Sequence, residues 1–115
     1  LVLTSGSYVD TVQFDVTVGA KQYLVWDDDP NASSGPLIDT ALQACGHVGD
    51  YSTTLPTTQL GDYLAIFVCV GIYPNNSVIQ DGSPEATALV DYLNSGGRMY
   101  LEGGDVWYYD PQNNS

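Results

Sequence analysis

Basic residues are almost missing from this chain of 115 residues. Lys21 and Arg98 are its only Lys and Arg, against 14 Asp and Glu, and the formal net charge is −12. Proteins hold nucleic-acid backbones with clusters of Lys and Arg, and anionic membrane surfaces attract the same residues. Because the sequence has no such cluster, we expect neither nucleic acid nor a membrane among its partners.

Long apolar runs are missing as well. No run approaches the ~20 residues that span a bilayer, and the chain begins at Leu1 without the charged and apolar regions of a signal peptide. We interpret it as a processed product or a piece of a longer polypeptide. Few basic residues together with 9 Tyr and 12 Gly are a composition that we associate with secreted bacterial proteins. The predicted location is extracellular, secreted or at the cell surface, and the predicted partner is the rest of a larger polypeptide.

Cysteine and histidine are scarce too, with Cys45, Cys69 and His47 as the complete set. Two alternatives stay open for the cysteines: one disulfide in an oxidising compartment, or two buried free thiols. A catalytic Cys–His pair is not expected, because Cys69 lies inside an apolar strand.

The first residues differ in pattern from the remainder. Val12, Phe14, Val16 and Val18 alternate with polar residues, which predicts a half-buried strand. We interpret residues 1–19 as the last strand of a preceding β-sandwich, with an edge strand of the main domain as the alternative. Residues 20–115 then form the main domain, which we expect to be truncated.

In the main domain, predicted strands alternate with predicted helices. The apolar runs 23–26 and 63–70 predict buried parallel strands, with weaker strands at 47–51 and 98–101. This alternation predicts an α/β fold of three layers, α/β/α, with a mostly parallel, flavodoxin-like sheet.

Capping residues mark the two predicted helices. The first begins at Ser33 or Ser34 and ends at Gly46; the second begins at Ser83 and ends at Gly96–Gly97. The predicted buried positions are Leu37, Ile38, Ala41, Leu42 and Cys45 in the first helix, and Leu89, Val90 and Leu93 in the second.

A nucleophile is missing where many α/β hydrolases and amidotransferases carry one. The strand 98–101 leads into a predicted turn, Glu102–Asp105, which offers two glycines and two acids but neither Cys nor Ser. We therefore expect a non-catalytic binding or structural module. Two alternatives are a hydrolase whose remaining catalytic residues lie beyond Ser115, and a module that self-associates into a homodimer through an exposed sheet edge.

Acidic residues follow two of the predicted strands. Ligands of open parallel sheets bind beyond the carboxyl ends of the strands, and oxygen ligands without Cys or His suit Ca²⁺ or Mg²⁺. The sequence thus predicts a Ca²⁺ site, with a solvated turn that caps the first helix as the alternative. The candidate metal ligands are Asp27, Asp28, Asp29, Glu102 and Asp105.

Several of these segments together resemble a known superfamily. Leu60-Gly61-Asp62-Tyr63, the helix end Tyr92-Leu93-Asn94-Ser95-Gly96-Gly97 and the strand end Glu102-Gly103-Gly104 are similar to class I glutamine amidotransferase-like proteins. The resemblance covers roughly residues 21 to 107. More narrowly, the chain is similar to secreted bacterial modules of that fold attached to larger extracellular proteins. It implies a flavodoxin-like fold. Because the superfamily's nucleophile, histidine and acid have no counterparts here, it does not imply glutaminase activity.

Overall fold

A parallel β-sheet with helices packed against it forms the fold of this protein. The computed structural model describes residues 21–106 and residue 108, so the strand predicted within 1–19 lies outside the described residues. A 3₁₀ turn (Leu60–Asp62) precedes the third strand. The described elements are, in chain order, β1 (Lys21–Asp27), α1 (Gly35–Ala44), β2 (Gly49–Ser52), β3 (Tyr63–Ile72), α2 (Pro84–Asn94) and β4 (Met99–Gly104).

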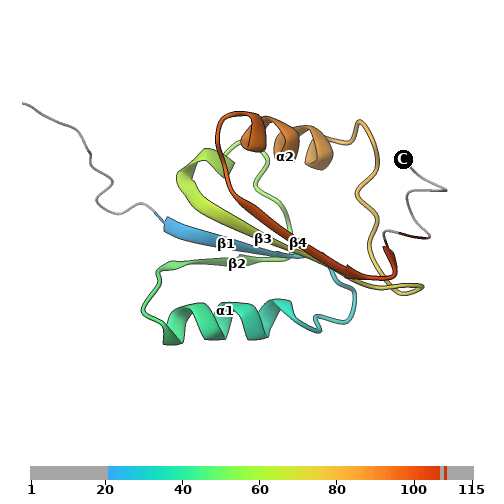
Figure 1. Cartoon of the computed structure of the whole chain (residues 1–115), viewed down its shortest axis with the longest axis horizontal. Coiled ribbons are helices and arrows are strands. Elements are labelled where there is room, and N and C mark those ends of the chain that lie inside the picture. Colours follow the sequence, from blue (N-terminus) through green and yellow to red (C-terminus); the bar gives the residue numbers. More distant parts are fainter. Residues whose placement is uncertain (1–20, 107, 109–115) are drawn as a thin grey trace, which may run out of the picture.

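The four strands are hydrogen-bonded in the order β2-β1-β3-β4, and all neighbours are parallel. In the register of the central pair, Val25 lies opposite Phe67. Helices α1 and α2 lie on opposite sides of the sheet (Figure 1). The predicted α/β fold with a parallel, flavodoxin-like sheet is therefore confirmed. All four strands end at one edge of the sheet, which we call the carboxyl edge.

The apolar core lies between the sheet and α2. Because side chains alternate along a strand, alternate residues in the middle of β1 and β3 share this side and form one apolar cluster with Leu89 and Tyr92 of α2. The core residues are Leu24, Trp26, Leu55, Leu60, Ile66, Val68, Val70, Leu89, Tyr92 and Val106. The predicted buried face of α2 is therefore partly wrong, since Val90 and Leu93 are 55% and 42% exposed.

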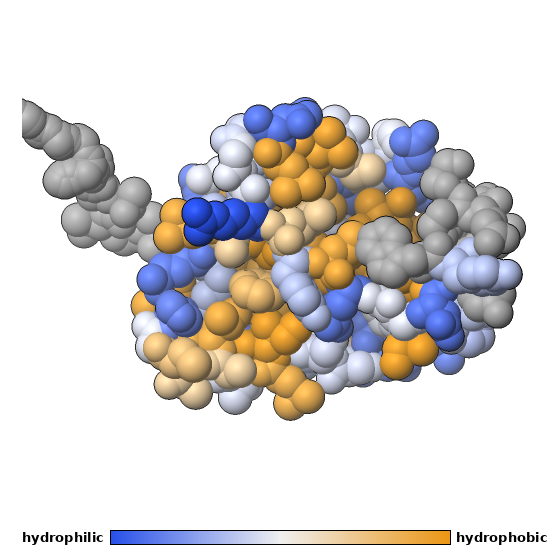
Figure 2. Space-filling model, in the orientation of Figure 1, coloured by the Kyte–Doolittle hydropathy of each residue, from blue (hydrophilic) through white to orange (hydrophobic). Residues whose placement is uncertain are grey.

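The side of the sheet that faces α1 is less completely covered. Leu37 of α1 is 70% exposed and Tyr100 of β4 is 51% exposed. Between them lies an open hollow of about 320 Å³, lined also by Ile38, Ala41 and Phe67. Figure 2 shows apolar side chains gathered over α1 and the adjoining sheet. The predicted buried positions of α1 are therefore wrong: Ile38 and Leu42 are half-buried, and Leu37, Ala41 and Cys45 are exposed.

Two strands extend further than their sequences predict. Strand β3 continues through Gly71, which has φ of +92°, with an irregular register between Cys69 and Ile72. Strand β4 includes Glu102, Gly103 and Gly104, which were expected to form a turn. The chain turns only at Asp105, which has φ of +61°.

Candidate functional site

The acids that follow β1 are divided between the two sides of the sheet. Asp27 ends β1 on the side of α1, and Asp28 lines a pocket on the side of α2. The alternation of side chains explains the division, because neighbouring residues in extended backbone point in opposite directions. The three consecutive acids therefore do not form one cluster.

Asp27 is buried and hydrogen-bonded by its own chain. The Tyr51 hydroxyl donates to Asp27 Oδ2 at 2.5 Å, and this hydrogen bond raises the pKa of Tyr51 to about 12. Gly35, the first residue of α1, lies against the Asp27 carboxyl group, where a Cβ atom would overlap it. A glycine is thus required here for α1 to begin this close to β1.

Asp29 is buried too, and it stabilises the turn that leads to α1. Its Oδ1 accepts from the backbone N–H of Asn31 and its Oδ2 from that of Ser33, both at 2.8 Å. Burial alone would raise the pKa of Asp29, but these hydrogen bonds outweigh it and lower the pKa below its ordinary value. Both carboxylate oxygens of Asp29 therefore have partners within the turn.

Glu102 lies on the side of α1, where the Ser34 hydroxyl donates to its Oε1 and the Tyr100 hydroxyl donates to its Oε2 at 3.3 Å. The nearby Cys69 is fully buried, and burial raises the pKa of its thiol to about 11. Asp105 is exposed, in the turn after β4.

The structure brings Asp27 and Glu102 to the same side of the sheet, near Cys69, and leaves Asp28 on the other side. Within residues 21–106 and 108, no group of three or more His, Cys, Asp or Glu side chains is arranged to hold a metal ion. Calcium binding by the five predicted ligands stays a prediction.

The two cysteines of the chain are free. Cys69 is buried, but Cys45 is exposed at the end of α1, so neither the disulfide nor the pair of buried thiols is found. His47 precedes β2 at the end of the sheet opposite the carboxyl edge. A Cys69–His47 pair is therefore excluded by position.

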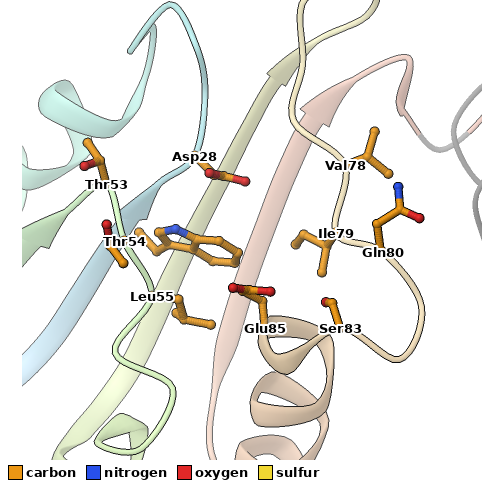
Figure 3. Close-up of a pocket in the computed structure, with 10 residues that line it drawn as sticks. Asp28, Thr53, Thr54, Leu55, Val78, Ile79, Gln80, Ser83 and Glu85 are labelled. Atoms are coloured by element: carbon orange, nitrogen blue, oxygen red, sulfur yellow. The ribbon is translucent and has the colours of Figure 1, made fainter.

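A pocket of about 190 Å³ opens at the carboxyl edge on the side of α2. We call it the Trp26 pocket. Figure 3 shows Thr53, Thr54 and Leu55 on one side and Val78, Ile79 and Gln80 on the other. Trp26 of β1 and Asp28, the residue after β1, also line the pocket. Ser83 and Glu85 line it from the start of α2.

The indole N–H of Trp26 has no hydrogen-bond partner. Trp26 is 3% exposed, and in the described part of the chain its Nε1 is the one buried side-chain polar atom without a partner. A buried donor left unpaired costs about 1–3 kcal/mol, so such groups in native proteins call for an explanation.

The sequence does not predict this pocket, although it contains local signals at Trp26, Asp28 and Ser83. The sequence predicts a buried strand at Trp26 and the start of a helix at Ser83. The sequence does contain one signal for the pocket: Trp26 and Asp28 are two residues apart, so in extended backbone their side chains lie on the same side of the sheet. No signal in the sequence brings the segment 78–80 to the same place.

No protein-family model, curated protein or solved structure matches this chain. The resemblance to the glutamine amidotransferase-like superfamily therefore stays a prediction. None of the described helices is long and apolar enough to cross a membrane.

Proposed function

We propose that this chain is a non-catalytic binding module that holds a small ligand in the Trp26 pocket. The observation that carries the proposal is the unpartnered Trp26 N–H, which is buried beside a pocket at the carboxyl edge. A ligand that accepts a hydrogen bond from Nε1 removes the cost of the unpaired donor. Open parallel sheets commonly bind their ligands at this edge.

Two observations support a role in binding rather than catalysis. The thiol of Cys69 is fully buried and its pKa is raised to about 11, so little reactive thiolate forms at neutral pH. The segment Glu102–Gly104 is strand and carries no nucleophile. The scarcity of Lys and Arg supports placing this module in a secreted protein.

Nuclear magnetic resonance of the indole N–H groups tests the proposal. The chain has two tryptophans, Trp26 and Trp107, and Trp26→Phe identifies which indole signal belongs to the pocket. A panel of monosaccharides, amino acids, amines and carboxylic acids is titrated into the uniformly ¹⁵N-labelled protein. We expect at least one compound to shift the Trp26 signal saturably and to lose that effect on Trp26→Phe. A signal that no compound shifts contradicts the proposal.

A second candidate function is self-association through the side of the sheet that faces α1. Among the described strands, β4 lies at the end of the sheet and has a hydrogen-bonded neighbour on one side only. Exposed strand edges favour pairing with another chain. The exposed Leu37 and Tyr100 beside the open hollow favour the same role.

Light scattering as a function of concentration tests self-association. We expect a dimer mass that falls to the monomer mass in Tyr100→Lys, because a charge on this apolar surface opposes its burial. Val90→Lys, an exposed apolar position on α2, is the matched control and should leave the mass unchanged. A monomer at high concentration rules out this second function.

A further inference from the structure

Three polar groups of the Trp26 pocket have no partner among the described residues, and two of them are negatively charged. Besides the Trp26 N–H, the carboxylates of Asp28 and Glu85 line the pocket half-buried. Neither carboxylate has a hydrogen-bond or ion-pair partner among residues 21–106 and 108. A ligand that satisfies all three groups needs an acceptor for the N–H and a cationic donor for the carboxylates.

The basic residues of this chain lie too far away to supply that cation. Lys21 begins β1 and already forms an ion pair with Asp50 at 2.7 Å. Arg98 directly precedes β4, also at the opposite end of the sheet from the pocket. A strand of seven residues spans roughly 20 Å, and charges that far apart are largely screened at physiological ionic strength. The pocket therefore keeps its negative charge and disfavours anions.

The walls of the pocket suit an organic cation better than a metal ion. Calcium takes six to eight oxygen ligands and favours several carboxylates, whereas in the described part of the chain no third His, Cys, Asp or Glu joins Asp28 and Glu85 in a group that could hold a metal ion. Indole rings attract ammonium groups through their π electrons. The volume of about 190 Å³ lies below the usual range for drug-sized ligands, so a compound of monosaccharide size or smaller fits.

We propose that the Trp26 pocket binds a small organic ammonium ion that also carries a hydroxyl or carbonyl oxygen. This inference rests on the proposed binding function and names the chemistry of its ligand. The ammonium group lies between the carboxylates of Asp28 and Glu85, and the oxygen accepts the hydrogen bond of Trp26 Nε1. The hydroxyls of Thr53, Thr54 and Ser83 are available for further hydroxyls of the ligand.

Matched pairs of probes test the charge requirement. Ethanolamine and glucosamine carry the ammonium group, and ethylene glycol and glucose carry a hydroxyl in its place. Each is titrated into the full 115-residue chain while the Trp26 indole signal is followed. We expect each amine to bind more tightly than its neutral match, and affinity to weaken as NaCl is raised. Binding constants on the order of millimolar are expected for ligands with so few atoms.

Substitutions that preserve shape test the two carboxylates. Asp28→Asn and Glu85→Gln should each weaken amine binding roughly tenfold, because each removes one charge-assisted hydrogen bond. Asp91→Asn makes the same charge change at an exposed position of α2 and should leave affinity unchanged. Loss of binding in this control as well would indicate a general charge effect and overturn the assignment.

The remaining outcomes separate the two proposals. If glucose, ethylene glycol or acetate shifts the Trp26 signal as strongly as the amines, the ligand class is wrong and the binding function stands. If calcium chloride shifts it and Asp28→Asn abolishes the effect, the pocket is a metal site and the ammonium proposal fails. If no compound here or in the wider panel shifts it, both proposals fail.

Discussion

The two sides of the sheet differ in how completely their buried polar side chains are hydrogen-bonded. On the side of α1, the Tyr23 hydroxyl donates to Asp39, that of Tyr51 to Asp27, and that of Ser34 to Glu102. On the side of α2, an apolar core leads to a pocket where Trp26 Nε1 has no partner within the described residues.

This difference indicates which groups the chain satisfies by itself. A buried polar group costs free energy unless it is hydrogen-bonded, and the hydroxyls on the side of α1 meet this requirement with carboxylates from neighbouring elements. The unpaired groups of the Trp26 pocket leave the same requirement open. For this reason we place the binding function on the side of α2, although the acids that first suggested a site lie on both sides.

The largest expected effect comes from the apolar residues that distinguish the two sides. Leu24, on the side of α2, is 1% exposed, whereas Leu37 of α1 is 70% exposed. We expect Leu24→Ala to lower the free energy of unfolding by about 3 kcal/mol or more, and Leu37→Ala by less than about 0.5 kcal/mol. Urea denaturation monitored by tryptophan fluorescence measures both. Equal losses would mean that the two sides contribute equally to the core.

Asp29 should give the next largest effect, because it is buried and both of its carboxylate oxygens accept backbone hydrogen bonds. Asp29→Asn keeps one acceptor and places an NH₂ group against the other N–H, so we expect a loss of about 2 kcal/mol. The same urea experiment measures it. A loss below about 0.5 kcal/mol would show that the turn does not depend on this carboxylate.

Acid should destabilise the protein partly through the same side chain. Hydrogen bonds lower the pKa of Asp29 despite its burial, and Lys21 and Tyr63 lower that of Asp50. A carboxyl group with a lowered folded-state pKa contributes stability above its unfolded pKa of about 4, and this is lost as pH falls through the folded value.

Thermal melts from pH 7 down to pH 2 therefore should show a falling midpoint below about pH 4. The fall should be shallower in Asp29→Asn, which lacks one of the two groups. A variant whose midpoint falls as steeply as that of the wild type would remove Asp29 from this explanation.

The smallest effect is expected at the acid next in sequence. Asp28 is half-buried in the Trp26 pocket, and its carboxylate makes no hydrogen bond or ion pair with the described residues. Asp28→Asn should therefore change the free energy of unfolding by less than about 0.5 kcal/mol, although we expect it to weaken amine binding. A large destabilisation would mean that the chain itself uses this carboxylate, and the comparison between the two sides would fail.

Local signals predicted the helices well where a capping residue and a proline occur together. Ser83 precedes Pro84, and its hydroxyl accepts from the backbone N–H of Ala86 as an N-cap does. The buried stripe of α2 was less predictable, because it includes Tyr92 in place of Val90 and Leu93. The Tyr92 hydroxyl donates a hydrogen bond to the Tyr63 carbonyl at 3.0 Å. The periodicity of apolar residues along a helix cannot predict such a contact.

Glycines misled the prediction of where strands end. The strand 63–70 was predicted to end before Gly71, and Gly103–Gly104 were predicted to lie in a turn, yet all three glycines belong to strands. A Cβ at Gly71 would lie 2.6 Å from Asp29 Oδ1, and one at Gly103 would lie 2.5 Å from a methyl group of Val106. These glycines allow other segments to approach the strand ends closely, and a local pattern cannot distinguish this role from a turn.

The sequence by itself determined the class of fold, the positions of both helices and the edge of the sheet at which ligands were expected. Those features depend on local periodicity, capping residues and the shared direction of parallel strands. Only the tertiary structure brought acids of different strands together, because the strand register aligns Asp27 of β1 and Glu102 of β4 with Cys69 of β3. It also placed the segment 78–80 and the start of α2 next to Trp26. Those residues are more than 50 positions apart from Trp26 along the chain, and the packing of α2 on the sheet brings them together.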